Sequence, residues 1–301
     1  MKKPVISVVI ATYKRPGILS RAIDSVLMQD YSDFEIIVVD DNGAGSDMQK
    51  ATQKMLFEKY NDDRIVYVAN EKGLGGGGAR NEGIKRARGE YVAFLDDDED
   101  WLPGKLSKQV KVYSESPPDV GVVDTGFYTI NSKGDVTTHL PEMQGDIFRE
   151  LLLKKLLNKR APKLSTMLCR RNALIDVGMF DPELRSRQDL DLYIRLAKKY
   201  KFVSIPEPLA NKREDADERI STNRESKLRG AEILYNKLYS ELKSYPPAHC
   251  DYLFRYSLLL MKTGHYRKGA AKLLKAFLLM MLNPVVILLL AKKNFIRVSG
   301  K

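Results

Sequence analysis

The segment "EYVAFLDDDEDW" (Glu90–Trp101) decides the fold, because it joins an apolar run directly to a cluster of acids. Its first half, Glu90–Leu95, has the continuous apolar character of a strand that is buried on both faces, as in a parallel sheet. Asp96, Asp97 and Asp98 follow at once. In open α/β sheets the ligand binds at the carboxyl ends of the strands. The segment therefore predicts a strand that carries its aspartates to a binding edge.

Three further strand-like runs lie upstream of this segment and alternate with helix-like runs. Strands that alternate with helices predict a doubly wound, mostly parallel sheet that is flanked by helices. The expected strands cover residues 5–11, 34–40 and 64–70. The expected helices begin near Pro16, Asp47 and Ala79.

The alternation loosens after Trp101, where helix-like and strand-like segments mix. From Arg224 onward the chain reads as helical. We therefore predict an α/β, Rossmann-like catalytic domain over residues 1–223 and a C-terminal helical extension over residues 224–301.

Composition narrows the class of protein. The formal net charge of +11 is compatible with binding to nucleic acid, to an anionic membrane surface or to phosphorylated substrates. No arginine-rich run or aromatic RNA-binding motif occurs, so we expect no nucleic-acid partner. The two cysteines, Cys169 and Cys250, argue against a disulfide framework or a zinc site and favour a reducing compartment, hence the cytoplasm. The apolar N-terminal run is too short and too β-branched for a signal sequence.

The glycine-rich run "GLGGGG" (Gly73–Gly78) satisfies the dinucleotide fingerprint G-x-G-x-x-G, with Asp96 about 20 residues further on. Two features argue against an NAD site. The first strand-to-helix turn, "TYKRPG", lacks the glycines that a dinucleotide fold carries there. A metal-free pyrophosphate would also be repelled by the acid cluster. We interpret the run as a flexible turn that brings the backbone close to a ligand and delivers Arg80 toward it.

The carboxyl edge of the predicted sheet gathers an unusual number of acids. Two like charges about 4 Å apart repel by roughly 4 kcal/mol at an effective dielectric near 20. A divalent cation relieves this repulsion, and oxygen ligands suit Mg2+ or Mn2+ together with substrate phosphates. The sequence therefore predicts a metal-bridged nucleoside diphosphate. The strand-end acids are Asp40, Asp41, Asp96, Asp97 and Asp98, with Asp100 beyond them.

Four segments, in this order, resemble the family 2 inverting glycosyltransferases of the GT-A fold. They are "SVVIATYKRP", "EIIVVDD", "GGGGARNEGIKRARGEYVAFLDDDEDWLP" and "RSRQDLDLYIRLAKKY", and the resemblance spans Pro4 to Asn223. It implies transfer of a sugar from a nucleoside-diphosphate sugar to a hydroxyl of a glycan or lipid-linked acceptor, in cell-surface polysaccharide or glycoconjugate synthesis. Uridine is the expected base, with thymidine and guanosine left open. The Q-x-x-R-W motif of processive members is absent, so one sugar is expected per encounter.

The resemblance also assigns the donor-binding residues. It implies that the end of the first strand, Ala11, Thr12 and Tyr13, lines the nucleoside, with Tyr13 stacked on the base. Asp41 would accept a hydrogen bond from the base, with Asp40 in support. Capping of a helix or turn within "DDNGAGSD" remains the alternative role for these two acids. The same match places Arg80 near the diphosphate or the base edge.

The "DDD" run matches the DXD motif of the family. By that match Asp96 and Asp97 contact the ribose or the metal shell. Asp98 is the direct metal ligand, with Asp96 as a second one. The expected cofactor is Mn2+ or Mg2+, with the nucleotide sugar as substrate.

The resemblance places a catalytic base in "RSRQDLDL". Asp189 would take the proton of the acceptor hydroxyl, and Asp191 is the alternative. Gln188 stands where the family often has Glu, so the usual acid pair is altered. Trp101 is expected on the acceptor side, or else as a core anchor. Arg219 and Ser221 are further acceptor contacts.

The run "AFLLMMLNPVVILLLA" (Ala276–Ala291) is the most apolar stretch of the chain. It is shorter than the ~20 residues of a spanning helix, and Asn283 and Pro284 interrupt it. Lysines flank it on both sides. This pattern predicts a helical hairpin that contacts an anionic membrane surface through residues 272–297, on the inner face of the cell membrane. A helical cap on the catalytic domain and a contact between two copies of the chain are the alternatives.

Two other functions share the strand-end acids. A metal-dependent nucleotidyltransferase would carry its glycine-rich phosphate loop after the first strand, which "ATYKRPG" fits poorly. A non-catalytic nucleotide-sugar-binding module would lack a base, and Asp189 argues against it.

Overall fold

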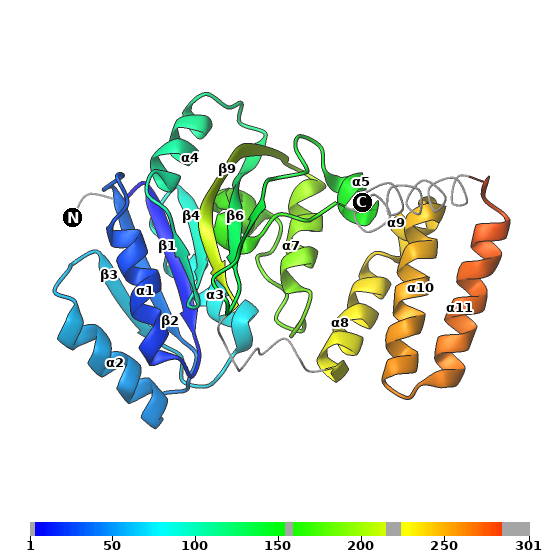
Figure 1. The fold of residues 1–301 in the computed structure, drawn as a ribbon, viewed down its shortest axis with the longest axis horizontal. Coiled ribbons are helices and arrows are strands. Elements are labelled where there is room, and N and C mark those ends of the chain that lie inside the picture. The colour runs from blue at the N-terminus through cyan, green and yellow to red at the C-terminus, as the bar shows by residue number, and fades with distance from the viewer. Residues whose placement is uncertain (1–3, 154–158, 215–223, 285–301) are drawn as a thin grey trace. The chain divides into compact units, whose positions relative to one another are not determined.

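The computed structural model describes residues 4–153, 159–214 and 224–284. Its centre is a nine-stranded sheet with the order β3-β2-β1-β4-β8-β6-β9-β5, and β7 pairs with β6 (Figure 1). The first half of the sheet is parallel, as the sequence predicts. Its strands are β1 (Ile6–Thr12), β2 (Phe34–Asp40), β3 (Ile65–Ala69) and β4 (Tyr91–Asp96).

The second half of the sheet is mixed. β8 runs antiparallel to both β4 and β6, β9 runs parallel to β6, and β5 closes the edge antiparallel to β9. The sheet is therefore a mostly parallel mixed sheet, which confirms the predicted fold class. These strands are β5 (Glu99–Trp101), β6 (Val120–Ile130), β7 (Val136–His139), β8 (Leu168–Arg170) and β9 (Lys201–Arg213).

Helices precede and follow these strands in the alternation that the sequence predicts. The first four are α1 (Pro16–Leu27), α2 (Asp47–Lys59), α3 (Gly75–Arg86) and α4 (Lys105–Ser114). The middle of the chain holds α5 (Phe148–Leu153), the 3-10 helix η1 (Leu164–Thr166), α6 (Arg171–Asp176) and α7 (Gln188–Ala197). The last four are α8 (Arg224–Lys237), α9 (Tyr239–Ser244), α10 (Pro246–Lys262) and α11 (Tyr266–Met281).

The parallel strands are covered on both faces. Val8 of β1 shares a buried apolar cluster with Leu19 of α1 and Leu56 of α2. Val9 points to the other face, because successive residues of a strand alternate, and there it meets Gly83 of α3. Burial on both faces explains why these strands read as continuous apolar runs.

The chain divides into two compact units. The first contains residues 1–146, 162–183 and 195–218, and the second contains residues 147–161, 184–194 and 219–301. The predicted boundary at residue 223 lies outside the described residues. The predicted helical extension starts at residue 224, so it does not include α5 or the start of α7, which belong to the second unit. Within the second unit, Arg149 of α5 lies 5.3 Å from the ring centre of Tyr245. Ser186 donates to the carbonyl of Ser226 (2.9 Å).

Gly83 sets the separation of α3 and β1. A Cβ there would lie 2.3 Å from Cγ1 of Val9, which is 1% exposed. We expect Gly83→Ala to lower the free energy of unfolding by about 1–3 kcal/mol, because the extra carbon overpacks a central strand. Gly17→Ala is the control in another helix. A Cβ there would meet no atom within 4 Å other than those of its chain neighbours and the backbone of its own helix. This control should stay within about 0.5 kcal/mol of wild type. Urea unfolding that gave equal effects for both would contradict the close packing.

Candidate functional site

The strand ends meet at one edge of the sheet, as the sequence predicts. The parallel register pairs Thr12 of β1 with Asp40 of β2. It also pairs Ala11 with Asp96 of β4. The backbone nitrogen of Asp41 donates to the carbonyl of Thr12 (3.0 Å), which fixes the first residue beyond β2 against the end of β1. Ala11, Thr12, Asp40 and Asp96 therefore lie at the ends of adjacent strands, while the predicted Arg80 lies in α3.

The acid run turns sharply between β4 and β5. The side chains of Asp96 and Asp98 are 29% and 33% exposed. Those of Asp97 and Glu99 are only 9% and 4% exposed. Asp96 and Asp98 are thus the two acids that solvent reaches most readily, and these are the two predicted metal ligands.

Basic side chains surround the acid run, which the sequence argument did not anticipate. The repulsion among the acids, which a cation would relieve, is thus partly compensated by basic side chains of the protein itself. The ion pairs are Arg80–Asp96 (2.6 Å), Arg15–Asp98 (2.9 Å), Arg15–Asp97 (3.3 Å), Lys163–Glu99 (2.6 Å), Arg213–Asp100 (2.9 Å) and Arg21–Asp100 (3.5 Å).

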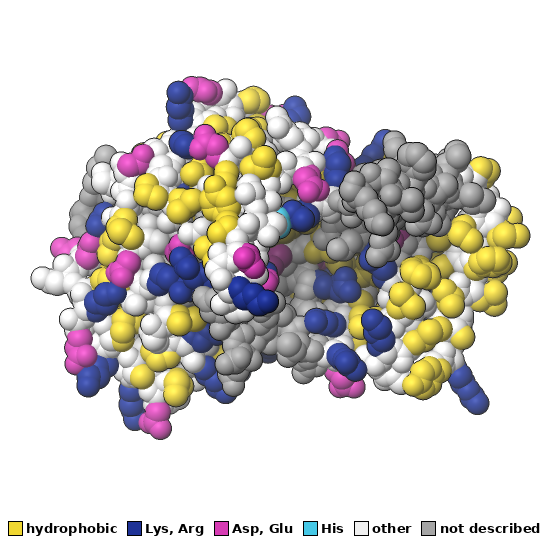
Figure 2. Space-filling view, in the orientation of Figure 1, with side chains coloured by type: hydrophobic (Ala, Val, Ile, Leu, Met, Phe, Trp, Pro, Cys, Tyr) yellow, Lys and Arg dark blue, Asp and Glu magenta, His cyan; other side chains and the backbone are white. Residues whose placement is uncertain are grey.

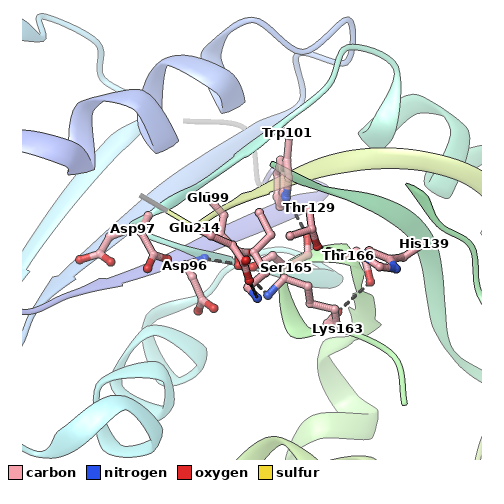
Figure 3. Close-up of polar contacts among 12 residues, drawn as sticks. Asp96, Asp97, Glu99, Trp101, Thr129, His139, Lys163, Ser165, Thr166 and Glu214 are labelled. Atoms are coloured by element: carbon pink, nitrogen blue, oxygen red, sulfur yellow. Dashed lines mark hydrogen bonds and ion pairs between the residues drawn. The ribbon is translucent and has the colours of Figure 1, made fainter. Parts of the chain in front are cut away.

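Three carboxylates have the spacing of a cation site. One oxygen from each of Asp96, Asp98 and Glu99 lies within 4.8 Å of the others. Figure 3 shows Glu99 next to Asp96, with Lys163 beside it. Oε2 of Glu99 is buried and makes no hydrogen bond within the described part of the chain. Such an oxygen, in a set of oxygen donors, fits Mg2+ or Mn2+.

Glu99 and Lys163 were missed from the sequence. Glu99 lies in the same acid run, so its position was a usable signal. Lys163 lies far along the chain and carried no signal. Burial raises the pKa of Glu99 to about 7, although Lys163 acts in the opposite direction. Burial alone would raise the pKa of Asp96 too, but Arg80 and Lys163 hold it below its ordinary value.

Asp97 ties the acid run to the end of β1. Its Oδ2 accepts a hydrogen bond from the hydroxyl of Thr12 (2.8 Å). Its Oδ1 accepts one from Arg15 (3.3 Å). Burial raises the pKa of Asp97 to about 6. The geometry gives Thr12 and Asp97 a positioning role at this edge, and their contact with a donor stays a prediction.

Asp40 is fully buried and serves the loop that follows β2. Its Oδ1 accepts hydrogen bonds from the backbone and side-chain nitrogens of Asn42 (2.9 and 2.7 Å). Its Oδ2 accepts one from the hydroxyl of Tyr67 (2.9 Å). These contacts fix the loop after β2, and the predicted support of Asp41 in binding a base stays a prediction.

Asp41 holds the glycine-rich segment. Its Oδ1 accepts hydrogen bonds from the backbone nitrogen of Leu74 (2.7 Å) and the side chain of Asn70 (2.8 Å). Its Oδ2 accepts one from the backbone nitrogen of Gly75 (2.7 Å). Asp41 therefore caps α3. The alternative role that the sequence left open was a cap within residues 40–47, so this contact with a helix further along the chain was not predicted. A carboxylate has about four acceptor positions, so one remains for a base.

The interpretation of the glycine-rich run as a flexible turn is wrong, because α3 begins at Gly75. Of the four consecutive glycines, only Gly75 has a positive φ (76°). Asp41 places its negative charge at the positive end of the helix dipole. A dinucleotide fold uses such a helix end for pyrophosphate. Asp41 already fills that position, which gives a physical reason against an NAD site.

Tyr13 is available at the same edge. Its side chain is 38% exposed, and Nζ of Lys14 lies 5.1 Å from its ring centre. The backbone nitrogen of Lys14 donates to the side chain of Asn42 (2.7 Å), which ties this loop to the one after β2. Lys14 has a φ of 58°, an uncommon conformation for a residue other than glycine. The predicted stacking of Tyr13 on a base stays a prediction.

Asp189 and Asp191 belong to the second compact unit. Both lie in the first turn of α7, after Arg187, whose φ is 62°. Asp191 is buried and forms an ion pair with Lys237 (2.6 Å). That pair gives Asp191 a structural role, and Asp189 as the base stays a prediction. Arg219 and Ser221 lie outside the described residues.

Trp101 is a core residue. It is 3% exposed, and its indole nitrogen donates to the carbonyl of Ser165 (2.7 Å). Nζ of Lys105 lies 3.9 Å from its ring centre. The burial of Trp101 agrees with the core anchor that the sequence offered as its alternative role. Trp101 is the last residue of β5, and its side chain belongs to the buried apolar cluster.

Comparison with known proteins agrees with this arrangement. The model of the family described as "Glycosyl transferase family 2" matches residues 7–182, more than half of the chain. The amylovoran biosynthesis glycosyltransferase AmsB of Erwinia amylovora is 33% identical over 216 residues, which cover 70% of this chain and 70% of that protein.

Two solved structures share the fold. The S. aureus TarS 1–349 complex with UDP-GlcNAc is 20% identical, with a TM-score of 0.60, and covers 90% of this chain and 89% of that one. The mannosyltransferase PcManGT of Pyrobaculum calidifontis, in complex with GDP-Man and Mn2+, is 18% identical, with a TM-score of 0.58, and covers 100% of this chain and 88% of that one. The strand order, the family match and the extent of identity to AmsB place this chain in glycosyl transferase family 2, and it is a glycosyltransferase.

Proposed function

We propose that this glycosyltransferase transfers one sugar, with inversion, from a nucleoside-diphosphate sugar to a hydroxyl of a glycan or lipid-linked acceptor. The observation that carries the proposal is the carboxylate cluster of Asp96, Asp98 and Glu99 at the carboxyl edge of the parallel strands. The relative AmsB is named for amylovoran biosynthesis, which supports a role in cell-surface polysaccharide synthesis. TarS was solved with UDP-GlcNAc and PcManGT with GDP-Man, so uridine and guanosine donors both stay open.

Asp96, Asp98 and Glu99 would hold Mn2+ or Mg2+. Their oxygens lie within 4.8 Å of one another, and the buried Oε2 of Glu99 suits a ligand role. The complex of PcManGT contains Mn2+. When bound, the cation supplies positive charge that stabilises a leaving diphosphate.

The protein's own residues would position the donor. Tyr13 offers an exposed ring for the base, and Asp41 keeps an acceptor position beside it. Arg80 and Arg15 pair with Asp96 and Asp98, so they lie next to the expected diphosphate position and would bind its oxygens once a cation takes over the two carboxylates. Guanidinium groups bind phosphate oxygens through paired hydrogen bonds.

Asp189 would act as the general base. It takes the proton of the acceptor hydroxyl as that oxygen forms a bond to the anomeric carbon. The bond from the anomeric carbon to the diphosphate oxygen breaks in the same step, and the electron pair leaves with the nucleoside diphosphate. Attack from the side opposite the leaving group inverts the anomeric centre.

A panel of donors, measured by thermal unfolding, tests the binding part of this proposal. In the presence of Mn2+, one class among UDP-, GDP- and dTDP-sugars should stabilise the protein by about 2.7 kcal/mol at 100 times its Kd. NAD under the same conditions is the control and should leave the unfolding temperature unchanged. Stabilisation by NAD with no response to any nucleotide sugar would contradict the proposal.

A further inference from the structure

The helical hairpin of α10 and α11 carries a large exposed apolar surface. Figure 2 shows hydrophobic side chains spread over the face of this region that is in view. We call these residues the hairpin surface. They are Phe254 (47% exposed), Leu258 (40%), Tyr266 (70%), Leu274 (60%), Phe277 (52%), Leu278 (52%), Met281 (63%) and Leu282 (81%).

Small residues on the inner side of α11 explain why its large ones face outward. A Cβ at Gly269 would lie 2.8 Å from Cγ of Met261 and 3.1 Å from the carbonyl of Ser257 in α10. Ala276 is buried on the same side, and its carbonyl accepts a contact from the thiol of Cys250 (3.3 Å). The two helices therefore approach closely through Gly269 and Ala276. The spacing of three and four residues along a helix then places Leu274, Leu278 and Met281 on a common outer face.

The charge of this region is one-sided. Residues 252–301 contain ten lysines and arginines and no aspartate or glutamate, while the whole chain carries a formal net charge of +11. In the described part of that segment the basic residues are Arg255, Lys262, Arg267, Lys268, Lys272 and Lys275. Asp251 of α10, just before this segment, pairs with Arg255 (2.8 Å). The other five basic residues leave the region with an excess of positive charge beside its outward apolar face.

We propose that the hairpin surface binds the interface of an anionic phospholipid bilayer. A helix with one apolar face and basic flanks inserts its apolar side chains at the headgroup boundary, and anionic lipids attract its lysines and arginines. A second copy of the chain would account for the apolar face alone. It brings the same positive charge and so would leave the charge of this segment without a counterpart. No helix among the described residues combines the length and apolarity that a membrane-spanning segment needs.

Vesicle co-sedimentation of the full chain tests this proposal. Vesicles of phosphatidylcholine with one-third phosphatidylglycerol should bind the protein, and pure phosphatidylcholine vesicles should bind it at least about tenfold more weakly. Leu274→Glu combined with Leu278→Glu should weaken binding by about tenfold or more, because two apolar side chains no longer insert. The control carries the same substitutions on an exposed apolar pair of α2, Met48 (44%) and Phe57 (68%), and should bind like wild type.

A second pair of variants separates local charge from net charge. Arg267→Glu combined with Lys268→Glu should weaken binding to the anionic vesicles by about tenfold. Lys50→Glu combined with Lys54→Glu changes the net charge equally, on exposed side chains of α2 (67% and 73% exposed), and should have little effect. Each variant should keep the wild-type unfolding temperature, since the substituted side chains are exposed.

Three results would overturn the proposal. The first is wild-type protein that does not bind anionic vesicles. The second is equal loss of binding in the hairpin and α2 variants, which would indicate an effect of net charge alone. The third is a wild-type dimer in sedimentation that Leu274→Glu converts to a monomer without any change in vesicle binding. That result would assign the surface to contact between copies. None of these readouts requires sugar transfer, so they are independent of the proposed reaction.

Discussion

Asp98→Asn is expected to reduce donor turnover by about 1,000-fold or more, because several kcal/mol of charge stabilisation depend on this carboxylate. Asp98 is the more exposed of the two predicted ligands, and its oxygen lies within 4.8 Å of those of Asp96 and Glu99. The variant should also need a higher Mn2+ concentration for half-maximal activity. Steady-state release of the nucleoside diphosphate across a Mn2+ titration measures both effects.

Asp62→Asn is the matched control for the Asp98 variant. It also removes a carboxylate from an arginine, since Arg64 lies 2.7 Å from Asp62 in an ion pair away from the acid run. Its turnover and its Mn2+ requirement should equal those of wild type. If Asp98→Asn behaved in the same way as this control, Asp98 would not be a ligand.

Asp189→Asn is expected to reduce sugar transfer by about 100- to 10,000-fold, the usual contribution of a general base. The amide keeps the size of the side chain but cannot take the proton of an acceptor hydroxyl. Donor binding should survive, because none of the residues assigned to the nucleoside changes. Transfer rates and donor affinity, measured on the same preparation, would separate the two effects. Unimpaired transfer would reject Asp189 as the base.

Asp191→Asn distinguishes a base from a structural acid in the same turn of α7. Asp191 is buried against Lys237 (2.6 Å), and the loss of that charged contact should lower the free energy of unfolding by about 1.5–3 kcal/mol. Transfer by the folded variant should fall much less than for Asp189→Asn. The opposite ranking of the two variants would move the base to Asp191.

The parallel half of the sheet was predictable because burial on both faces leaves a simple pattern. β2 begins and ends at the predicted residues, Phe34 and Asp40, and β1 is displaced by one residue. The location of the candidate site was predictable for the same reason. A parallel register brings the ends of neighbouring strands to one edge of the sheet, so Thr12, Asp40 and Asp96 lie there for any conformation of the loops.

The partners of the acids were not predictable, because they come from distant parts of the chain. Arg15 pairs with Asp98 across 83 positions, and no local pattern records that contact. Lys163 approaches Glu99 from the segment before β8 in the same way. The sequence therefore indicated a need for positive charge without showing that the protein supplies part of it.

The predicted flexible turn at the glycine-rich run is wrong for a local reason. Consecutive glycines disfavour a helix by about 1 kcal/mol each relative to alanine, so a turn was the natural prediction. In the structure Asp41 accepts hydrogen bonds from two backbone nitrogens at the start of α3 and so stabilises a helix there. The hydrogen bonds to Asp41, a residue distant in the sequence, therefore outweigh the low helix propensity of the glycines at the start of α3.

Turnover of labelled nucleotide sugars by the purified full chain, with Mn2+ and after its removal by a chelator, tests metal-dependent sugar transfer most directly. We predict that at least one of the UDP-, GDP- or dTDP-sugars loses its sugar to an acceptor or to water. Chelation should abolish this activity, and added Mn2+ should restore it. Turnover that is unaffected by chelation, or no turnover of any donor with Mn2+ or Mg2+, would contradict the assignment of Asp96, Asp98 and Glu99 to the metal.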